Sequence, residues 1–327
     1  MSGTLKHTSA IFPVQPDELE PMVEFGTFAR DLGVRRLWLG QSLRLETHLA
    51  LAAFAARVPG VPLGTSVALT ILRHPYQAAV EARSISALSG APYVAGFGPG
   101  ATSFQKQFLG EPYAKPLRAM TEYVSVVRRL LDSAQVIHEG EYFTSTSAML
   151  HVPAPAVEVG LGVLRPGMAR TVGEIADVAI TWLTPHWYIK DQLIPAIAEG
   201  ARNADRATTP RVASVVHAAL ARPGRNLRRL AFAAAGPHLG SPHYTDMLKR
   251  GGLSVDPRDP IRGAEELIRE QVFATGTAED VAKVVRAHRE AGVDEVVINV
   301  CGLYFAEGPK AAARDLREIL EAVGADD

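Results

Sequence analysis

Short apolar runs alternate with longer amphipathic stretches along the chain. Eight of the runs have the length and composition of buried strands: Ser9–Phe12, Leu37–Leu39, Leu63–Leu69, Tyr93–Phe97, Val157–Leu161, Val178–Thr181, Val212–Leu220 and Glu295–Val300. Eight stretches with helical character lie between or after them: Asp17–Leu32, Leu45–Val58, Tyr76–Leu88, Leu117–Leu131, Met168–Ile175, Ile189–Asn203, Ala278–Ala291 and Lys310–Val323. Such alternation is typical of βα units around a parallel sheet. Eight units close a ring, so we predict an α/β fold of the (β/α)8, or TIM-barrel, type.

Proline and glycine residues support several of these boundaries, for example Pro75 where a helix begins and Gly90 where it ends. Three segments are too long for the connections of a minimal barrel, and we interpret them as insertions at its rims. They lie near residues 100–115, 138–156 and 222–276, the last with a short helix near Tyr244–Arg250. TIM barrels of this size form one domain, so we expect a single domain over residues 1–327.

The charge balance bears on the kind of partner. Lys and Arg number 34 against 35 Asp and Glu, so no net field attracts nucleic acid or an anionic membrane, and a small-molecule substrate fits better. The longest apolar stretch, Leu49–Ala56, is far shorter than the roughly 20 residues of a membrane span. The N-terminus has no apolar segment of the kind that secretion signals carry, so we expect a cytoplasmic protein. The single cysteine, Cys301, stands in the apolar run VVINVCG, and we interpret it as a buried strand residue rather than a nucleophile.

Active sites of TIM barrels lie at the C-terminal ends of the strands, so the residues after each run are the candidates. Gln41 and Ser42 follow the second run, where they either reach the mouth of the barrel or cap the next helix. The third run, LGTSVALTILRHP, is interrupted by Gly64, Thr65 and Ser66. Glycine inside a strand indicates a bulge or the close approach of a ligand, and the sequence leaves both open.

Glycines also follow the fourth and fifth runs. Gly96-Phe97-Gly98-Pro99-Gly100 could point backbone N–H groups inward around an anion, although glycine-rich turns are frequent without one. Gly160-Leu161-Gly162 resembles the start of a dinucleotide fingerprint. Arg165 occupies the place of its third glycine, so a nicotinamide-binding fold is the least favoured alternative.

Aromatic and imidazole side chains follow the sixth run. Trp182 and Trp187 could form a wall for a flat cofactor. His186 lies between them and could supply a proton to a substrate, although most loop histidines are not catalytic. His238 and His243 stand close together without a third ligand, so we predict no metal site.

Several blocks, taken in order, resemble the luciferase-like monooxygenase superfamily, in particular its F420-dependent oxidoreductase branch. The most specific block is LGTSVALTILRHPYQAAVEARSISALSGAPYVAGFGPG, from Leu63 to Gly100. The blocks QFLGEPYAKPLRAMTEYVSVVRRLL and GEIADVAITW are similar to the family's following units. The resemblance covers nearly the whole chain. It implies a bacterial-luciferase-like barrel that binds coenzyme F420 or FMN.

The resemblance also implies where the cofactor ring lies. It would rest against a bulge in the third strand that contains a cis peptide bond at Ser66–Val67. The residues implied to line the cofactor are Gln41, Ser42, Ser66, Val67, Ala68, Gly96, Phe97, Gly98, Gly100, Gly160, Leu161, Gly162 and Trp182. The chain departs from the family pattern at Gln41, where several branches have histidine, and at Ala101, where some have histidine or a carboxylate.

Three functions remain open at this stage. The leading hypothesis is hydride transfer between C5 of F420 and a C=O, C=N or activated C=C group, with His186 or Gln41 as the catalytic residue that protonates or polarises the substrate. The alternatives are an FMN-dependent monooxygenase and a catalytically silent barrel that acts as a binding subunit. The 222–276 insertion would shape the substrate site. Relatives often dimerise through helices beside the second and third units, which implies a homodimer, although a buried helix face explains Leu49–Ala56 equally well.

Overall fold

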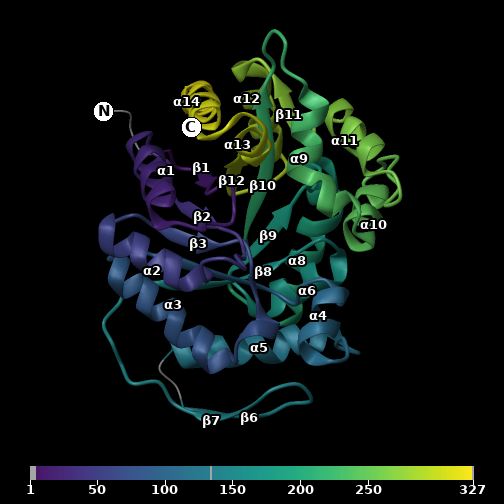
Figure 1. The fold of residues 1–327 in the computed structure, drawn as a ribbon. Coiled ribbons are helices and arrows are strands. Elements are labelled where there is room, and N and C mark those ends of the chain that lie inside the picture. The colour runs from purple at the N-terminus through teal and green to yellow at the C-terminus, as the bar shows by residue number, and fades with distance from the viewer. Residues whose placement is uncertain (1–4, 133–134, 326–327) are drawn as a thin grey trace.

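Within residues 5–132 and 135–325, which the computed structural model describes, eight parallel strands form a closed ring (Figure 1). In order around the ring they are β1 (Thr8–Ile11), β2 (Leu37–Leu39), β3 (Leu63–Thr65), β5 (Tyr93–Gly98), β8 (Val157–Gly162), β9 (Val178–Trp182), β10 (Arg211–Leu220) and β12 (Glu295–Asn299). Each strand pairs with the next, and β12 pairs with β1 to close the ring. The predicted TIM barrel is confirmed, and the eight apolar runs form its strands.

The third run is divided by a break in the strand. β3 ends at Thr65, and the chain resumes as β4 (Ala68–Leu69), which pairs with β5. The peptide bond between Ser66 and Val67 is cis, as the resemblance implied. At the end of β3 the Thr65 hydroxyl holds the strand to β5, because it accepts from Gly96 N at 2.9 Å and donates to Gly96 O at 3.0 Å. A short 3-10 helix (Thr70–Leu72) follows.

An outer layer of helices surrounds the barrel (Figure 1). The main helices of this layer are α1 (Leu19–Asp31), α2 (Thr47–Arg57), α3 (Pro75–Ser89), α5 (Pro116–Leu131), α6 (Pro166–Ile175), α8 (Ile194–Asn203), α12 (Ala278–Glu290) and α14 (Pro309–Gly324). Several begin at proline, whose fixed φ suits a first helical turn. The predicted helix Ile189–Asn203 is divided, because α7 (His186–Tyr188) and a wider helical turn (Ile189–Leu193) precede α8. In the described ranges no helix is both long enough and apolar enough for a bilayer span.

The three long segments contain more regular structure than the sequence analysis predicted. The first carries α4 (Thr102–Leu109), and the second carries an antiparallel hairpin of β6 (Val136–Glu139) and β7 (Thr144–Ser147). The third carries α9 (Leu227–Leu239), α10 (Pro242–Arg250), α11 (Pro260–Arg269) and β11 (Phe273–Gly276). Only α10 was expected there. Figure 1 shows α9, α10 and α11 together beside β10, far from the hairpin.

A buried carboxylate ties the hairpin to the helix layer. Glu122 of α5 accepts hydrogen bonds from three successive backbone N–H groups of the turn, those of Glu141 at 3.0 Å, Tyr142 at 2.8 Å and Phe143 at 3.2 Å. It also accepts from Arg118 Nε at 3.0 Å. Burial raises the pKa of Glu122, but the N–H of Tyr142 and its other donors outweigh it and bring the value down to about 2.

The barrel interior is filled with large side chains in its middle. Its apolar cluster consists of Ile11, Trp38, Val94, Val178, Ile180, Ala213, Val215 and Val297. Gly64 makes room for one of them, since a Cβ there would lie 2.7 Å from the Trp38 ring. Below this cluster, Glu295 is fully buried, accepts from Ser9 Oγ at 2.6 Å and pairs with Arg36 Nε at 3.3 Å. The barrel is therefore a packed core with an ionic floor.

The last apolar run ends one residue earlier than predicted. β12 ends at Asn299, and Cys301 is the first residue of α13 (Cys301–Glu307) instead of a strand residue. The Asn299 side chain accepts a hydrogen bond from the Cys301 N–H at 2.9 Å, so this N–H is not available for pairing in the sheet. Cys301 is buried, and burial raises the pKa of its thiol to about 12.

Candidate active site at the mouth of the barrel

Two polar side chains occupy the top layer of the barrel interior. Side chains two residues apart on a strand share a face, so His217 lies above Val215 on β10 and Asn299 lies above Val297 on β12. The strands align His217 with Asn299 and Val215 with Val297. Because the two valines belong to the interior cluster, His217 and Asn299 also point inward, one layer closer to the C-terminal ends of the strands.

Asn299 holds the imidazole of His217. Its Nδ2 lies 3.3 Å from His217 Nε2, and both residues are buried. The other imidazole nitrogen, His217 Nδ1, is also buried and has no hydrogen-bond partner among the described residues. Buried polar atoms in native proteins nearly always have a partner, so this nitrogen marks a place where a ligand or water atom belongs.

Trp182 lies beside His217 at the end of β9. The centroids of the two rings are 4.9 Å apart, and the Trp182 ring also lies 5.5 Å from the ring of His238 on α9. Trp182 Nε1 and His238 Nδ1 are likewise buried without a partner in the described part of the chain. Tyr244 of α10 contacts the His238 ring at 4.7 Å. The 222–276 insertion thus covers this side of the mouth with aromatic groups.

Burial keeps both histidines of this cluster neutral. It lowers the pKa of His217 to about 3, with a smaller contribution from the nearby His238. It lowers the pKa of His238 to about 4, with a smaller contribution from His243. At neutral pH these rings are therefore hydrogen-bonding groups without charge.

The bulge of the third strand forms the opposite wall. Val67 packs against the interior cluster together with Trp182. It also faces two glycines, since a Cβ at Gly98 would lie 2.7 Å from Val67 Cγ2 and a Cβ at Gly162 would lie 3.5 Å from Val67 Cγ1. The apolar cluster thus closes the mouth from below, with the bulged backbone on one side and unpartnered ring nitrogens on the other. This arrangement suits a flat heteroaromatic group with polar edges.

Comparison with known proteins identifies the family. A family model described as luciferase-like monooxygenase matches residues 3–295. The chain belongs to the luciferase-like monooxygenase family.

Relatives of known activity match most of this luciferase-like chain. The 5,10-methylenetetrahydromethanopterin reductase of Archaeoglobus fulgidus is 26% identical over 306 residues, which cover 86% of this chain and 88% of the reductase. The F420-dependent glucose-6-phosphate dehydrogenase of Rhodococcus erythropolis is 27% identical over 292 residues, which cover 84% and 83%. The solved coenzyme F420-dependent tetrahydromethanopterin reductase of Methanopyrus kandleri has a TM-score of 0.73, 21% identity and 97% coverage of both chains. That likeness shows the shared fold.

The side chains of Gln41 and Ser42 are engaged by the protein itself. Gln41 Oε1 accepts from Leu69 N at 2.9 Å, and its Nε2 donates to Ser42 O at 2.8 Å. Ser42 Oγ accepts from Arg44 N at 3.1 Å, and Ser42 N donates to Thr47 Oγ1 at 2.8 Å. The bond from Leu69 N fastens the loop after β2 to β4, and the other bonds hold the loop itself and its junction with α2. In this structure Gln41 positions the bulge of the luciferase-like barrel.

The remaining residues predicted to line the cofactor fall into inward-facing and outward-facing groups, because successive side chains on a strand alternate between its two faces. Gly98 and Gly162 face the mouth, and Ser66 and Val67 form the bulge. Gly96 and Gly160 face inward one layer deeper, where their missing side chains make room for Ile180 of β9. The side chains of Phe97, Leu161 and Ala68 belong to the outer core between barrel and helices, so only their backbone lies near the mouth. Gly100 has a left-handed φ of 73° and its carbonyl accepts from Gln105 Nε2.

His186 lies in the helix layer. Its ring contacts Trp187 at 5.0 Å and His288 of α12 at 5.6 Å. Trp187 in turn donates to Gly251 O at 2.8 Å. Burial lowers the pKa of His186, Glu290 raises it and Lys190 lowers it further. The structure brings Gln41, Trp182 and the bulge to the barrel end and places His186 among helices outside it.

Sequence reasoning did not select His217 or Asn299. The available signal was a polar residue at an inward position near the end of an apolar run, as in SVVHAAL and VVINV. Within residues 5–132 and 135–325, no three His, Cys, Asp or Glu side chains are grouped as metal ligands.

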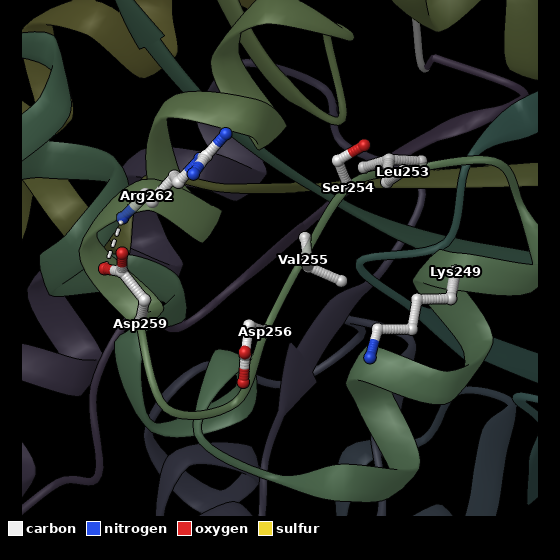
Figure 2. Close-up of a pocket in the computed structure, with 7 residues that line it drawn as sticks. All are labelled: Lys249, Leu253, Ser254, Val255, Asp256, Asp259 and Arg262. Atoms are coloured by element: carbon white, nitrogen blue, oxygen red, sulfur yellow. Dashed lines mark hydrogen bonds between the residues drawn. The ribbon is translucent and has the colours of Figure 1, made fainter.

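Two cavities lie apart from the mouth. One of about 350 Å³ lies where α10 ends and α11 begins, with Lys249 and Arg262 on opposite sides (Figure 2). The other, of about 220 Å³, lies near the start of β10 and includes Arg211. Neither is lined by a residue predicted to bind the cofactor.

Proposed function

We propose that this chain is an oxidoreductase that uses coenzyme F420 to transfer a hydride to a small substrate. One observation carries the proposal: Val67 of the bulge and Trp182 pack on the same interior cluster, and the unpartnered nitrogens of Trp182 and His217 lie beside it. F420 is preferred to FMN because a relative matched over most of its length is named as F420-dependent.

The residues at the mouth fit a deazaflavin ring. Gly98 and Gly162 make room for the Val67 side chain, which offers an apolar surface. Trp182 provides an aromatic wall. Gln41 keeps the bulge in place through its bond to Leu69 N. When bound, F420 would supply the hydride at C5, while the chain orients the substrate and excludes water.

The proposal extends to location and assembly. A cytoplasmic protein that acts on a small molecule agrees with the near-zero formal charge of −1. We also propose a homodimer through the region of α2, on which Leu49 is 71% exposed.

The test is a binding titration with a matched pair of variants. Purified protein is titrated into F420 and, separately, into FMN, and quenching of the cofactor fluorescence is recorded. Gly162→Ala adds a methyl group facing the mouth, so F420 affinity should fall about tenfold, equivalent to 1.4 kcal/mol. Gly167→Ala is the control, because it lies in the first turn of α6 and its Cβ would meet only Leu117 at 3.4 Å.

Each outcome separates the candidate functions. Saturable F420 binding that weakens only in Gly162→Ala supports the proposal. Binding of FMN without F420 would replace it with the FMN-dependent monooxygenase, and oxygen consumption with reduced FMN would confirm that alternative. Binding of neither cofactor would favour a barrel without catalytic function.

A further inference from the structure

The hydrogen bonds around Asn299 determine the tautomer of His217. The backbone N–H of Cys301 can only donate, so the Asn299 atom at 2.9 Å from it must be the oxygen. The Asn299 amide nitrogen, which only donates, therefore faces His217 Nε2 at 3.3 Å. Nε2 must accept this bond and carries no proton. In the neutral imidazole the proton then lies on Nδ1.

The Nδ1–H group produced in this way is a buried donor without an acceptor. His217 is 0% exposed, and its Nδ1 has no hydrogen-bond partner in residues 5–132 and 135–325. The centroid of the His217 ring lies 4.9 Å from that of Trp182, whose Nε1–H is a second buried donor without a partner in the described residues. Leaving such donors unpaired costs about 1–3 kcal/mol each, which an acceptor atom of a bound molecule would offset.

We propose that His217 Nδ1–H donates a hydrogen bond to the oxygen of a neutral carbonyl substrate, and that Asn299 is the positioning residue that holds His217 in the required tautomer. The proposal rests on the function proposed above. During reduction, the hydride forms a new C–H bond as the C=O π electrons move onto oxygen. The oxygen takes its proton from water, the reduced coenzyme releases one proton to solvent, and His217 keeps its own.

The surroundings of the donor favour a neutral substrate. Trp182, Asn299 and His238 carry no charge at this point, and burial holds the pKa of His217 at about 3. A buried phosphate or carboxylate would require a cationic partner. His217 is also a poor base for removing a proton from an alcohol, because its unprotonated nitrogen is occupied by Asn299. The geometry therefore suits carbonyl reduction.

The first experiment determines the tautomer of His217 in the absence of substrate. Nitrogen-15 NMR of protein labelled at histidine distinguishes Nδ1–H from Nε2–H, and the His217 signal is assigned by its loss in His217→Asn. The wild-type ring should be in the Nδ1–H form between pH 6 and 8. Asn299→Asp, whose carboxylate accepts, should convert it to Nε2–H. An Nε2–H ring in the wild-type protein would overturn the proposal.

The second experiment measures turnover with neutral ketones. Acetone and cyclohexanone are supplied with reduced F420, and the return of oxidised F420 absorbance is followed. His217→Phe should lower kcat about 100-fold, the effect of removing one donor to a developing oxyanion. His217→Asn, whose amide nitrogen can stand near the Nδ1 position, should recover part of this loss. In both variants kcat should fall more than F420 affinity, because the donor acts on the substrate oxygen.

Failures of the two proposals are distinguishable. If F420 binds but neither ketone is reduced, or if His217→Phe retains the wild-type kcat, the role of His217 is refuted and the F420 proposal stands. If F420 does not bind, the proposed function fails, and the reduction step fails with it. The NMR result then still decides whether Asn299 sets the tautomer.

Discussion

Gly96 tests whether the inward glycines of the barrel serve packing or the ligand. A Cβ added to Gly96 would lie 2.1 Å from Thr65 O and 2.4 Å from Ile180 Cδ1. The first of these atoms belongs to the backbone of β3. Two hydrogen bonds tie the Thr65 hydroxyl to Gly96, so β3 cannot move away without losing them. Gly96→Ala should therefore destabilise the fold.

The magnitude follows from three contributions. Overpacking a well-filled core costs about 1–3 kcal/mol. Losing the bonds between Thr65 and Gly96 adds about 0.5–1.5 kcal/mol each. Alanine restricts the unfolded chain more than glycine, which offsets about 0.4–1 kcal/mol. We expect a net loss of about 2–4 kcal/mol for Gly96→Ala.

Gly162→Ala is the matched control for this experiment. Its Cβ would lie 3.5 Å from Val67 Cγ1 and 3.7 Å from Phe97 O, which are ordinary van der Waals contacts. Its stability should therefore stay within about 0.5 kcal/mol of wild type. Urea unfolding followed by circular dichroism gives the midpoints of both variants. Equal midpoints for Gly96→Ala and wild type, or an equal loss in both variants, would refute the assignment of Gly96 to packing.

Two further predictions concern buried ionisable groups. Glu122→Gln should speed hydrogen exchange at residues 139–143, because it loses charge-assisted hydrogen bonds worth about 2–3 kcal/mol. The control Glu141→Gln changes an exposed neighbour and should have little effect. Equal exchange rates in the two variants would contradict this prediction. Lowering the pH from 7.5 to 5 should destabilise the protein by about 2 kcal/mol for each of His217 and His288, whose folded pKa values of about 3 and 4 lie below the unfolded value of 6.5. In this range the unfolded chain binds protons that the folded chain does not, so the urea midpoint should fall as the pH is lowered. The midpoint of His288→Gln should fall less steeply.

The barrel strands could be predicted because a parallel sheet is covered on both faces. Its strands then appear as continuous apolar runs, such as Val178–Thr181, which local composition reveals. The β6–β7 hairpin has no such run, since TSTS of β7 is polar and partly exposed. α9 was not predicted; it contains Gly236 and Pro237, which disfavour a helix interior, although Asn226 caps it at Arg229 N.

The site was less predictable because it depends on register between distant strands. The sequence shows that Gly98 and Phe97 are neighbours, but only the strand phase shows that one faces the mouth and the other the helices. Here the alternation of period two was available and would have separated them. The pairing of His217 with Asn299 joins residues 82 positions apart. Local patterns contain no information on that register, so the pair emerged only from the fold.

The three layers of the barrel interior separate stability from function. At the bottom, the buried Glu295 carboxylate is surrounded by donors, including Ser9 and Trp38, so the protein itself compensates the charge. The middle layer is apolar and needs no partner. Some bottom-layer atoms, such as Arg36 Nε, also lack a hydrogen bond, but they lie in ion pairs, here 3.3 Å from Glu295. The top-layer donors of His217 and Trp182 have neither kind of partner in the described part of the chain. A fold selected for stability alone would gain by pairing them or replacing them with apolar groups. Their presence at the strand ends, where TIM barrels bind ligands, is therefore best explained by a molecule that supplies the acceptors.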